Sequence, residues 1–291
     1  MKCLKILAAL AVCVALMSGS ALAAQRPLPV TAGSDYLALG DSVTFGYQEP
    51  TVTPAPDYKS AASFPGYPEQ LAAALHLRVT NAACPGETSA SLVNTKAQSN
   101  GCENATRPGA ALYRKLFPLH VHYTGSQLAF AVGYLRSHHN VRLVSLMIGA
   151  NDFFVCQTTT KDRCASNAER ASVMTAVESN IRRILSAVRN QAHYKGQLVV
   201  VNYYALSYAS PAIIAQSALL NRTQDAAAKG FKVAIADGFG LLRAAAAHSE
   251  GGNTCAAGLL TQLSTGGCGI HPSYAGQALL AQAVARVIRL A

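Results

Sequence analysis

The stretch Tyr36-Leu-Ala-Leu-Gly-Asp-Ser42-Val-Thr-Phe-Gly-Tyr47 decides the fold prediction for this chain. Residues 36–39 are mostly apolar and predict a buried β-strand. The strand ends abruptly at Gly40-Asp41-Ser42, which are residues typical of turns. A serine that follows a buried strand lies at the carboxyl edge of its sheet, where open α/β sheets bind ligands. Taken alone, the tripeptide is equally consistent with an ordinary turn, so its meaning depends on the rest of the chain.

Strands and helices alternate along the rest of the sequence. Further strands are predicted at 78–84, 141–148, 197–204 and 232–236. Helices are predicted at about 65–77, 126–138, 174–188 and 211–229, and after His271-Pro272, where proline suits the first turn. This alternation predicts a parallel sheet whose strands are connected by right-handed crossovers through helices on both faces. We therefore expect a three-layer α/β/α sandwich with a central, mainly parallel five-stranded sheet.

The N-terminal residues predict a secretory signal peptide over residues 1–23. Two lysines precede an apolar run at 6–17, and Ala21-Leu22-Ala23 fits an A-x-A cleavage site. A retained membrane anchor is the weaker interpretation, because about 18 apolar residues are needed to span a bilayer. Residues 24–291 contain no repeat, linker or low-complexity segment, so one domain and a secreted or periplasmic location are expected.

Composition excludes a disordered chain and gives no sign of nucleic-acid binding. The 291 residues are 51% hydrophobic and 13% charged, which allows a large core. Without residues 1–23 the chain has 22 Lys and Arg against 14 Asp and Glu, a net charge of +8. These positive charges are dispersed rather than grouped in runs, which indicates solubility or weak attraction to anionic surfaces.

Six cysteines remain after removal of the signal peptide, and in an exported chain they predict three disulfides. Several connectivities are possible. The spacing favours pairing of sequence neighbours: Cys84 with Cys102, Cys156 with Cys164, and Cys255 with Cys268. A zinc site would need C-x-x-C or clustered Cys and His spacing, and the sequence has neither. No metal is expected.

Three of the predicted strands are followed by polar or glycine turns that contain Ser42, Gly86 and Asn151. The carboxyl ends of parallel strands meet at one edge of a sheet, so these turns can converge. With His271-Pro272 near the C-terminus, the ordered pattern resembles the SGNH, or GDSL, hydrolases, whose fold is flavodoxin-like. The resemblance covers essentially the whole chain after the signal peptide.

The resemblance implies a role for each of these residues. Ser42 would be the nucleophile and His271 the general base, because a serine needs a base of near-neutral pKa to take its proton. The backbone N–H groups of Ser42 and Gly86 and the side-chain amide of Asn151 would form the oxyanion hole. Glycine allows close approach of the backbone, and an amide donates without a charge.

The sequence departs from the family pattern at Cys268, where many members carry an aspartate that orients the histidine. Some secreted relatives use a main-chain carbonyl instead. We therefore expect a Ser-His dyad in which a carbonyl near Cys268 or Gly269 accepts the Nδ1–H of His271. A Cys255–Cys268 disulfide would stiffen this loop.

The resemblance implies a carboxylic ester hydrolase, an esterase or lipase that forms an acyl-enzyme without any cofactor. The loops at 48–63 and 89–123 are expected to shape a site for a small-molecule or lipid ester, in a monomer without stable membrane insertion. A carbohydrate acetylesterase is the alternative of the same class. A non-catalytic binding protein on the same scaffold is the alternative from another class, prompted by the missing aspartate.

Overall fold

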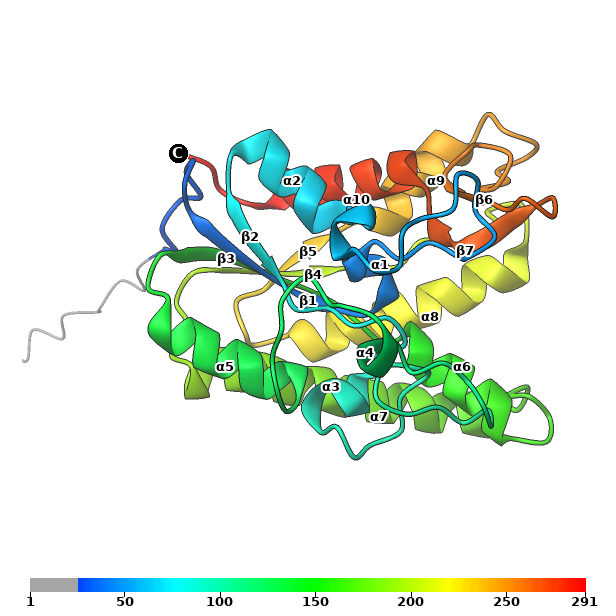
Figure 1. Ribbon diagram of the computed structural model, residues 1–291, viewed down its shortest axis with the longest axis horizontal. Coiled ribbons are helices and arrows are strands. Elements are labelled where there is room, and N and C mark those ends of the chain that lie inside the picture. Colours follow the sequence, from blue (N-terminus) through cyan, green and yellow to red (C-terminus); the bar gives the residue numbers. More distant parts are fainter. Residues whose placement is uncertain (1–25) are drawn as a thin grey trace, which may run out of the picture.

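A computed structural model describes residues 26–291, so the predicted signal peptide at 1–23 lies outside the described residues. The centre of the fold is a five-stranded, all-parallel sheet in the order β2-β1-β3-β4-β5 (Figure 1). Its strands are β1 (Asp35–Gly40), β2 (Arg78–Asn81), β3 (Val141–Met147), β4 (Gln197–Val201) and β5 (Ala234–Ala236). The predicted sheet is confirmed, and all five strands lie within one or two residues of, or inside, their predicted ranges.

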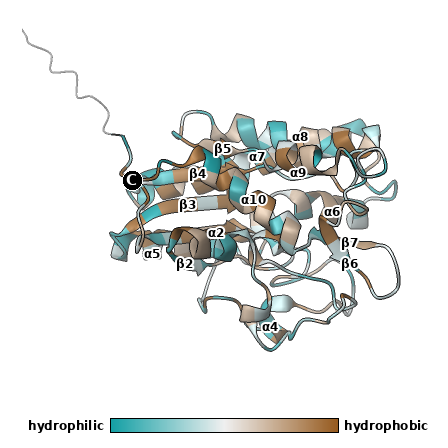
Figure 2. Cartoon of the chain, turned by 90° about the horizontal axis from the view of Figure 1, so that it is seen from above, coloured by the Kyte–Doolittle hydropathy of each residue, from teal (hydrophilic) through white to brown (hydrophobic). Residues whose placement is uncertain are grey.

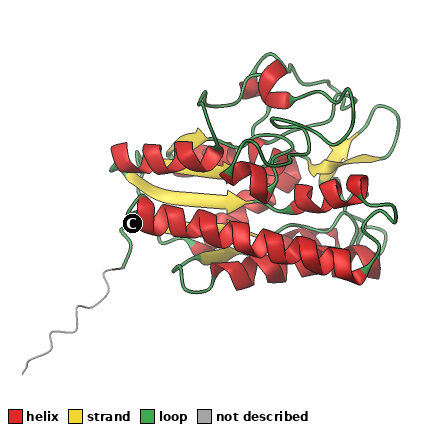
Figure 3. Ribbon diagram, turned by 90° about the horizontal axis from the view of Figure 1, so that it is seen from below, coloured by secondary structure: helices red, strands yellow, loops and turns green. Residues whose placement is uncertain are grey.

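Helices cover both faces of this sheet and complete the three layers (Figures 1 and 3). One face carries α2 (Tyr67–Leu75), α9 (Gly238–Ala246) and α10 (Tyr274–Val287). The other carries α5 (Gln127–Ser137), α7 (Asn167–Ser186), the short π-helix η2 (Ala187–Gln191) and α8 (Pro211–Ala228). The strand order and the two helical layers are those of flavodoxin-like folds. The predicted three-layer fold class is therefore confirmed.

Local sequence signals explain where the long helices begin. The hydroxyl oxygens of Ser126, Ser210 and Ser273 accept backbone N–H groups in the first turns of α5, α8 and α10. Such caps satisfy donors that have no partner inside the helix. Pro211 occupies the first position of α8, where its missing N–H costs nothing.

Several elements were not predicted. They are α1 (Ser42–Phe45), η1 (Ala61–Ser63), α3 (Ser89–Val93), α4 (Tyr113–Leu116), α6 (Ala150–Thr159), α9, and the antiparallel hairpin of β6 (Leu260–Gln262) and β7 (Cys268–Pro272). Most of them contain too few residues to show a period, whereas α6 and α9 are at least as long as the predicted α2 and were overlooked. Residues 89–123, expected to form a long and partly irregular segment, contain α3 and α4. The expected loop from Cys156 to Cys164 begins inside α6, which ends at Thr159.

The three predicted disulfides are present between Cys84 and Cys102, Cys156 and Cys164, and Cys255 and Cys268. Each closes a short loop, with sequence separations of 18, 8 and 13 residues. Cross-links of this kind are typically worth about 2 to 4 kcal/mol each. Over residues 26–291, none of the helices has the length and apolar character needed to cross a membrane.

The main hydrophobic core lies between the sheet and its helical layers. In the cartoon coloured by hydropathy, β3 and β4 are mostly apolar, while helices such as α7 and α8 mix polar and apolar residues (Figure 2). Residues of β1, β3 and β4 are almost entirely buried, as expected for a parallel sheet covered on both faces. Hydroxyl groups inside this core are paired: Ser145 Oγ lies 2.7 Å from the Tyr36 hydroxyl and 3.1 Å from the Tyr67 hydroxyl.

Replacing a side chain in the central strand β3 should cost far more stability than replacing an exposed one. Leu146 is 1% exposed, whereas Leu116 on α4 is 57% exposed. Leu146→Ala should lower the free energy of unfolding by about 2 to 5 kcal/mol, because it opens a cavity in a packed core. Leu116→Ala should change it by about 0.5 kcal/mol or less. Denaturant unfolding of both variants measures this, and equal losses would contradict the described packing.

Candidate active site

The register of the parallel strands brings the three predicted turns to one edge of the sheet. Gly40 at the end of β1 pairs with Met147 at the end of β3. On its other side, the β1–β2 ladder continues beyond β2, because the N–H of Cys84 donates to the carbonyl of Gly40 at 3.3 Å. The chain therefore leaves all three strands at the same level. Ser42, Gly86 and Asn151 consequently line one cavity.

Ser42 is the first residue of α1, so it lies on a sharp turn from strand to helix. The preceding residue, Asp41, caps this helix, and its Oδ1 accepts the N–H of Val43 at 3.0 Å. The other carboxylate oxygen accepts the Tyr203 hydroxyl and lies 3.5 Å from Asn151 Nδ2. Asp41 therefore fixes the turn that presents Ser42 to the cavity.

His271 approaches Ser42 from the opposite end of the chain. It lies on β7, and its Nε2 is 2.9 Å from Ser42 Oγ. Its Nδ1 is 2.7 Å from Oε1 of Glu49. The expectation that a backbone carbonyl near Cys268 or Gly269 accepts the Nδ1–H is therefore wrong. The Glu49 carboxylate occupies the position beside Nδ1, because the loop after α1 carries it there.

Gly86 has a left-handed backbone, with φ of +84°, and packs against the segment at Asn100. A Cβ at this position would lie 2.8 Å from the backbone carbon and oxygen of Asn100, so only glycine fits. The Asn100 N–H donates to the Gly86 carbonyl at 2.7 Å. Among the hydrogen bonds of residues 26–291, none uses the backbone N–H of Ser42 or of Gly86 as donor.

Asn100, which also packs against Gly86, orients the side chain of Asn151. Asn100 Nδ2 donates to Asn151 Oδ1 at 2.8 Å, which turns the Nδ2 of Asn151 away from Asn100. That Nδ2 makes only the long contact of 3.5 Å to Asp41 among the described residues. Its N–H groups are thus available to a ligand. Three donors in the cavity are therefore not committed to strong protein hydrogen bonds.

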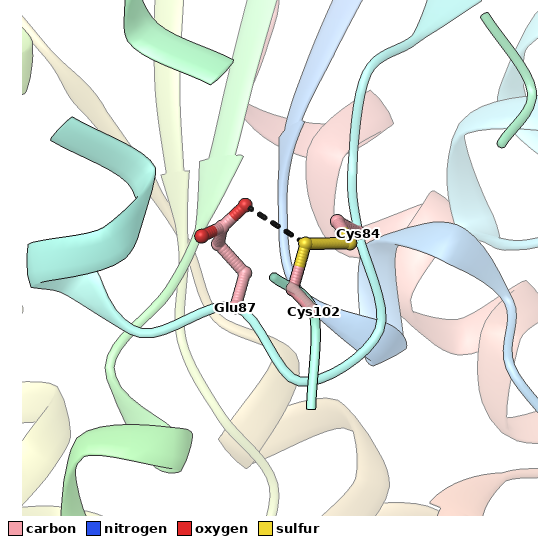
Figure 4. Close-up of side chains that lie close together, drawn as sticks. All are labelled: Cys84, Glu87 and Cys102. Atoms are coloured by element: carbon pink, nitrogen blue, oxygen red, sulfur yellow. Dashed lines mark hydrogen bonds between the residues drawn. A yellow bond between two sulfur atoms is a disulfide. The ribbon is translucent and has the colours of Figure 1, made fainter. Parts of the chain in front are cut away.

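The Cys84–Cys102 disulfide anchors the loop that carries Gly86 and Asn100, and the neighbouring carboxylate is buried beside it (Figure 4). Glu87 Oε2 lies 3.7 Å from Cys102 Sγ and accepts the Gln127 amide at 3.2 Å. Burial and the nearby Glu103 carboxylate raise the pKa of Glu87 well above its usual range. Within residues 26–291, both clusters with metal-ligand geometry contain a disulfide, so their sulfurs are not free thiolates.

The cavity around these residues has a volume of about 940 Å³. Its lining includes two apolar groups that come from different elements. The aromatic wall consists of Tyr47, Tyr58, Tyr113 and Phe117. The aliphatic wall consists of Met174 on α7, Leu206, and Ile213, Leu219 and Leu220 on α8. The Tyr47 ring centre lies 4.8 Å from that of His271, so the aromatic wall adjoins the histidine.

Burial makes ionisation of two carboxyl groups beside the site, those of Asp41 and Asp152, less favourable. Burial raises the pKa of Asp41 from 3.8 to about 6, although the Tyr203 hydroxyl and the Val43 N–H partly offset it. Burial likewise raises the pKa of Asp152 to about 6, against the hydrogen bonds from Ser89. These two acids hold the turns at the ends of β1 and β3 in place.

All four predicted site residues meet in this cavity, but sequence reasoning missed three supporting side chains. Glu49 lies in a loop without periodicity, Asn100 in an irregular segment, and Tyr203 two residues beyond the end of β4. The one available signal for Glu49 was its position: an acid in a loop expected to lie beside Ser42.

Comparison with solved structures agrees with this class of fold. A phospholipase A1 from Streptomyces albidoflavus NA297 shares 22% identity and a TM-score of 0.54, over 88% of this chain and 100% of its own. The acetylxylan esterase Axe2 from Geobacillus stearothermophilus shares 15% identity and a TM-score of 0.52, over 89% of this chain and 95% of its own. LAE5, an alpha/beta hydrolase enzyme from the metagenome of Lake Arreo, Spain, shares 16% identity and a TM-score of 0.52, over 88% of this chain and 95% of its own. At these identities, the likeness concerns the fold.

The fold and the cavity therefore define an α/β enzyme of the SGNH hydrolase type. Residues 38–279 match the GDSL-like lipase/acylhydrolase family, and this chain belongs to that family. It is a carboxylic ester hydrolase. Comparison with curated protein sequences finds no match.

The raised pKa of Asp41 predicts a pH dependence of stability. Native Asp41 keeps its proton up to about pH 6, whereas the unfolded chain releases it near 3.8, so the native state binds more protons in between. The free energy of unfolding should therefore fall as pH rises through this window, by about 3 kcal/mol from this group. Asp41→Asn should flatten that slope in denaturant unfolding at several pH values. An unchanged slope would contradict a buried, protonated Asp41.

Proposed function

We propose that this protein is a secreted serine hydrolase in which Ser42 is the nucleophile and His271 the general base. The observation that carries the proposal is the 2.9 Å distance between His271 Nε2 and Ser42 Oγ at the wall of a large cavity. A serine hydroxyl and an imidazole at hydrogen-bond distance form the pair that nucleophilic ester cleavage requires.

The reaction then proceeds in two steps. Ser42 Oγ attacks the ester carbonyl carbon as its proton passes to His271 Nε2, and a tetrahedral oxyanion forms. The bond to the alcohol oxygen breaks, and that oxygen takes the proton from Nε2, which leaves an acyl-enzyme on Ser42. In the second step, water attacks the acyl carbon while His271 Nε2 takes one of its protons. The bond between the acyl carbon and the Ser42 oxygen then breaks, that oxygen takes the proton from Nε2, and the carboxylic acid is released.

The oxyanion receives hydrogen bonds from the backbone N–H groups of Ser42 and Gly86 and from Nδ2 of Asn151. These are the donors that the protein leaves largely unused. Their positions are fixed in advance by Asp41 and Asn100, so they need no rearrangement when charge develops. Preorganised donors of this kind supply a large share of transition-state stabilisation.

The two apolar walls receive different parts of the ester. The leaving alcohol lies near His271, which protonates it, and Tyr47 of the aromatic wall packs against that imidazole. The carbonyl oxygen faces Asn151 at the start of α6, so the acyl chain extends toward the aliphatic wall of α7 and α8. A cavity of about 940 Å³ is near the upper end for small-ligand sites, which favours acyl chains longer than acetyl.

A carbohydrate acetylesterase is the second candidate. The aromatic wall favours it, because half-buried tyrosines such as Tyr47 and Tyr58 offer flat faces with hydroxyl groups. The solved acetylxylan esterase shares the fold. A non-catalytic binding protein is less well supported, since such a protein needs neither the Ser42–His271 contact nor unused donors beside it.

The cellular setting is part of the proposal. Three disulfides favour an oxidising compartment, in agreement with the signal peptide expected at 1–23. We also propose that residues 24–291 act as a single catalytic domain in a monomer, with an ester as the only partner and without a metal or organic cofactor.

Hydrolysis of p-nitrophenyl esters from acetate to long acyl chains, by the oxidised protein, tests the proposed function. Ser42→Ala and His271→Ala should abolish the activity. Asn151→Ala should lower kcat on the order of 10²- to 10³-fold through loss of one oxyanion donor. Full activity in Ser42→Ala would overturn the assignment of Ser42 as the nucleophile. Hydrolysis of the acetate ester alone would favour the carbohydrate acetylesterase.

Narrowing the aliphatic wall tests where the acyl chain binds. Ile213→Trp should lower kcat/KM for long acyl esters by about 10-fold or more relative to acetate, because the larger ring fills the acyl site. Ala212→Trp is the matched control, since Ala212 is exposed on the same helix and does not line the cavity. An unchanged acyl profile in Ile213→Trp would place the acyl chain at the aromatic wall.

A further inference from the structure

Glu49 lies where it can act on the histidine, although it follows Ser42 by only seven residues in sequence. After α1 the chain turns at Gly46, lines the cavity with Tyr47 and Pro50, and then pairs through Val52 with Leu263 next to the β6–β7 hairpin. This path brings the Glu49 carboxylate to 2.7 Å from His271 Nδ1, across a sequence separation of 222 residues. Ser42 Oγ lies at the other ring nitrogen.

The carboxylate is held in place by donors other than the histidine. The Ile270 N–H donates to Oε1 at 2.8 Å, and the Thr261 hydroxyl donates to Oε2 at 2.6 Å. Gly269 leaves the space that the carboxylate fills, because a Cβ there would lie 2.1 Å from Oε1. Both oxygens of Glu49 are thus engaged, and the side chain has little freedom to turn.

Backbone contacts dock the Glu49 loop onto the hairpin that carries His271. Val52 forms an antiparallel bridge with Leu263, and the Ser264 N–H donates to the Thr51 carbonyl at 2.6 Å. The Cys255–Cys268 disulfide ties the start of β7 to the segment before β6. These backbone contacts and the disulfide hold the segments that carry Glu49 and His271 next to each other.

The carboxylate is charged over the pH range of ester hydrolysis. Partial burial would raise the pKa of Glu49, but the hydrogen bond and the charge of His271 and the Thr261 hydroxyl outweigh it and lower the pKa to about 2. The side chains of His271 and Glu49 are only 10% and 19% exposed, so water screens the pair weakly.

We infer that Glu49 is the positioning residue of His271 and completes a Ser42–His271–Glu49 triad with an acid from the nucleophile's own loop. Oε1 accepts the Nδ1–H, which fixes the tautomer with Nε2 free to take the Ser42 proton. When Nε2 is protonated, the carboxylate stabilises the imidazolium. The inference rests on the proposed roles of Ser42 and His271.

The Glu49 carboxylate takes over a task that Cys268 cannot perform. The aspartate expected three residues before the histidine would lie on the same segment as His271, whereas Glu49 arrives from a separate loop. Cys268 is consequently free to form the disulfide that braces the hairpin. The acid Glu49 and the nucleophile Ser42 thus lie on the same short segment, whereas the base His271 lies on β7.

Three substitutions at Glu49 separate its charge from its hydrogen bond. Glu49→Gln can keep an oxygen beside Ile270 N–H and Nδ1, so it removes mainly the charge. Glu49→Ala removes both and should lower kcat on the order of 10³- to 10⁴-fold with KM near the wild-type value. Glu49→Gln should fall between wild type and Glu49→Ala, and Glu49→Asp should restore part of the activity.

The pH dependence of kcat/KM distinguishes an electrostatic role of Glu49 from a purely structural one, because loss of a structural contact alone would not shift it. The ionisable groups facing His271 are Glu49 and Asp41, together with Tyr47 and Tyr204, which are neutral near pH 7. Glu49→Gln removes the closest negative charge, so protonation of the imidazole becomes less favourable. The acidic limb of kcat/KM should therefore move to lower pH in Glu49→Gln.

Matched variants control for damage to the loop. Thr261→Val removes only the hydroxyl tie to Oε2, so it should lower kcat far less than Glu49→Ala. Gly269→Ala should displace the carboxylate and approach the Glu49→Ala rate, while Gly133→Ala in α5, where a Cβ meets no atom within 4 Å, should leave activity unchanged. Glu178→Gln on α7, outside the cavity, controls for the loss of a charge.

The outcomes distinguish this inference from the proposed function. If Ser42→Ala and His271→Ala are inactive while Glu49→Ala keeps full activity and Glu49→Gln keeps the wild-type pH profile, the role of Glu49 is overturned. The proposed function then still stands. Activity that survives in Ser42→Ala would overturn the proposed function itself. A loss in Thr261→Val as large as in Glu49→Ala would show that the carboxylate only ties two loops together.

Discussion

The parallel pairing of β1 with both β2 and β3 is the constraint on which the site depends. The register pairs Gly40 with Met147 on one side, and on the other side the Gly40 carbonyl accepts the N–H of Cys84, so three separate turns begin at the same level. A slip of one residue would turn every side chain of β1 to the other face of the sheet. Such a slip would move the buried Tyr36 hydroxyl away from Ser145 Oγ, which it meets at 2.7 Å, and leave it without this partner inside the core.

Polar contacts, rather than core packing, set the finer geometry of the cavity. Asp41 and Asn100 each hold one functional group in place, and the first of them is a buried acid that is costly to ionise. Buried polar groups of this kind stabilise a fold only when their hydrogen bonds are satisfied. Here the bonds run between turns at the ends of different strands, so they hold these turns in one arrangement.

The sheet, the long helices, the three disulfides, and the convergence of Ser42, Gly86, Asn151 and His271 could be predicted from the sequence. Buried parallel strands leave continuous apolar runs, amphipathic helices leave a period of about 3.6 residues, and the cysteines lie close to their partners in sequence. Glu49 left no such pattern, because its partner is 222 residues away and its loop has no period. The expected backbone carbonyl was wrong for the same reason: residues next to His271 were considered, while the space beside Nδ1 is filled from a different loop.

The short span of the three disulfides has a consequence for how the protein acquires its structure. The six cysteines of residues 26–291 can pair in many incorrect ways, but each native partner lies only 8 to 18 residues away. Closing a short loop costs less entropy than closing a long one, so native pairs meet more often than distant ones in an unfolded chain. When the reduced chain is oxidised, pairing of neighbouring cysteines is therefore favoured over pairing of distant ones, so little rearrangement of incorrect disulfides should be needed.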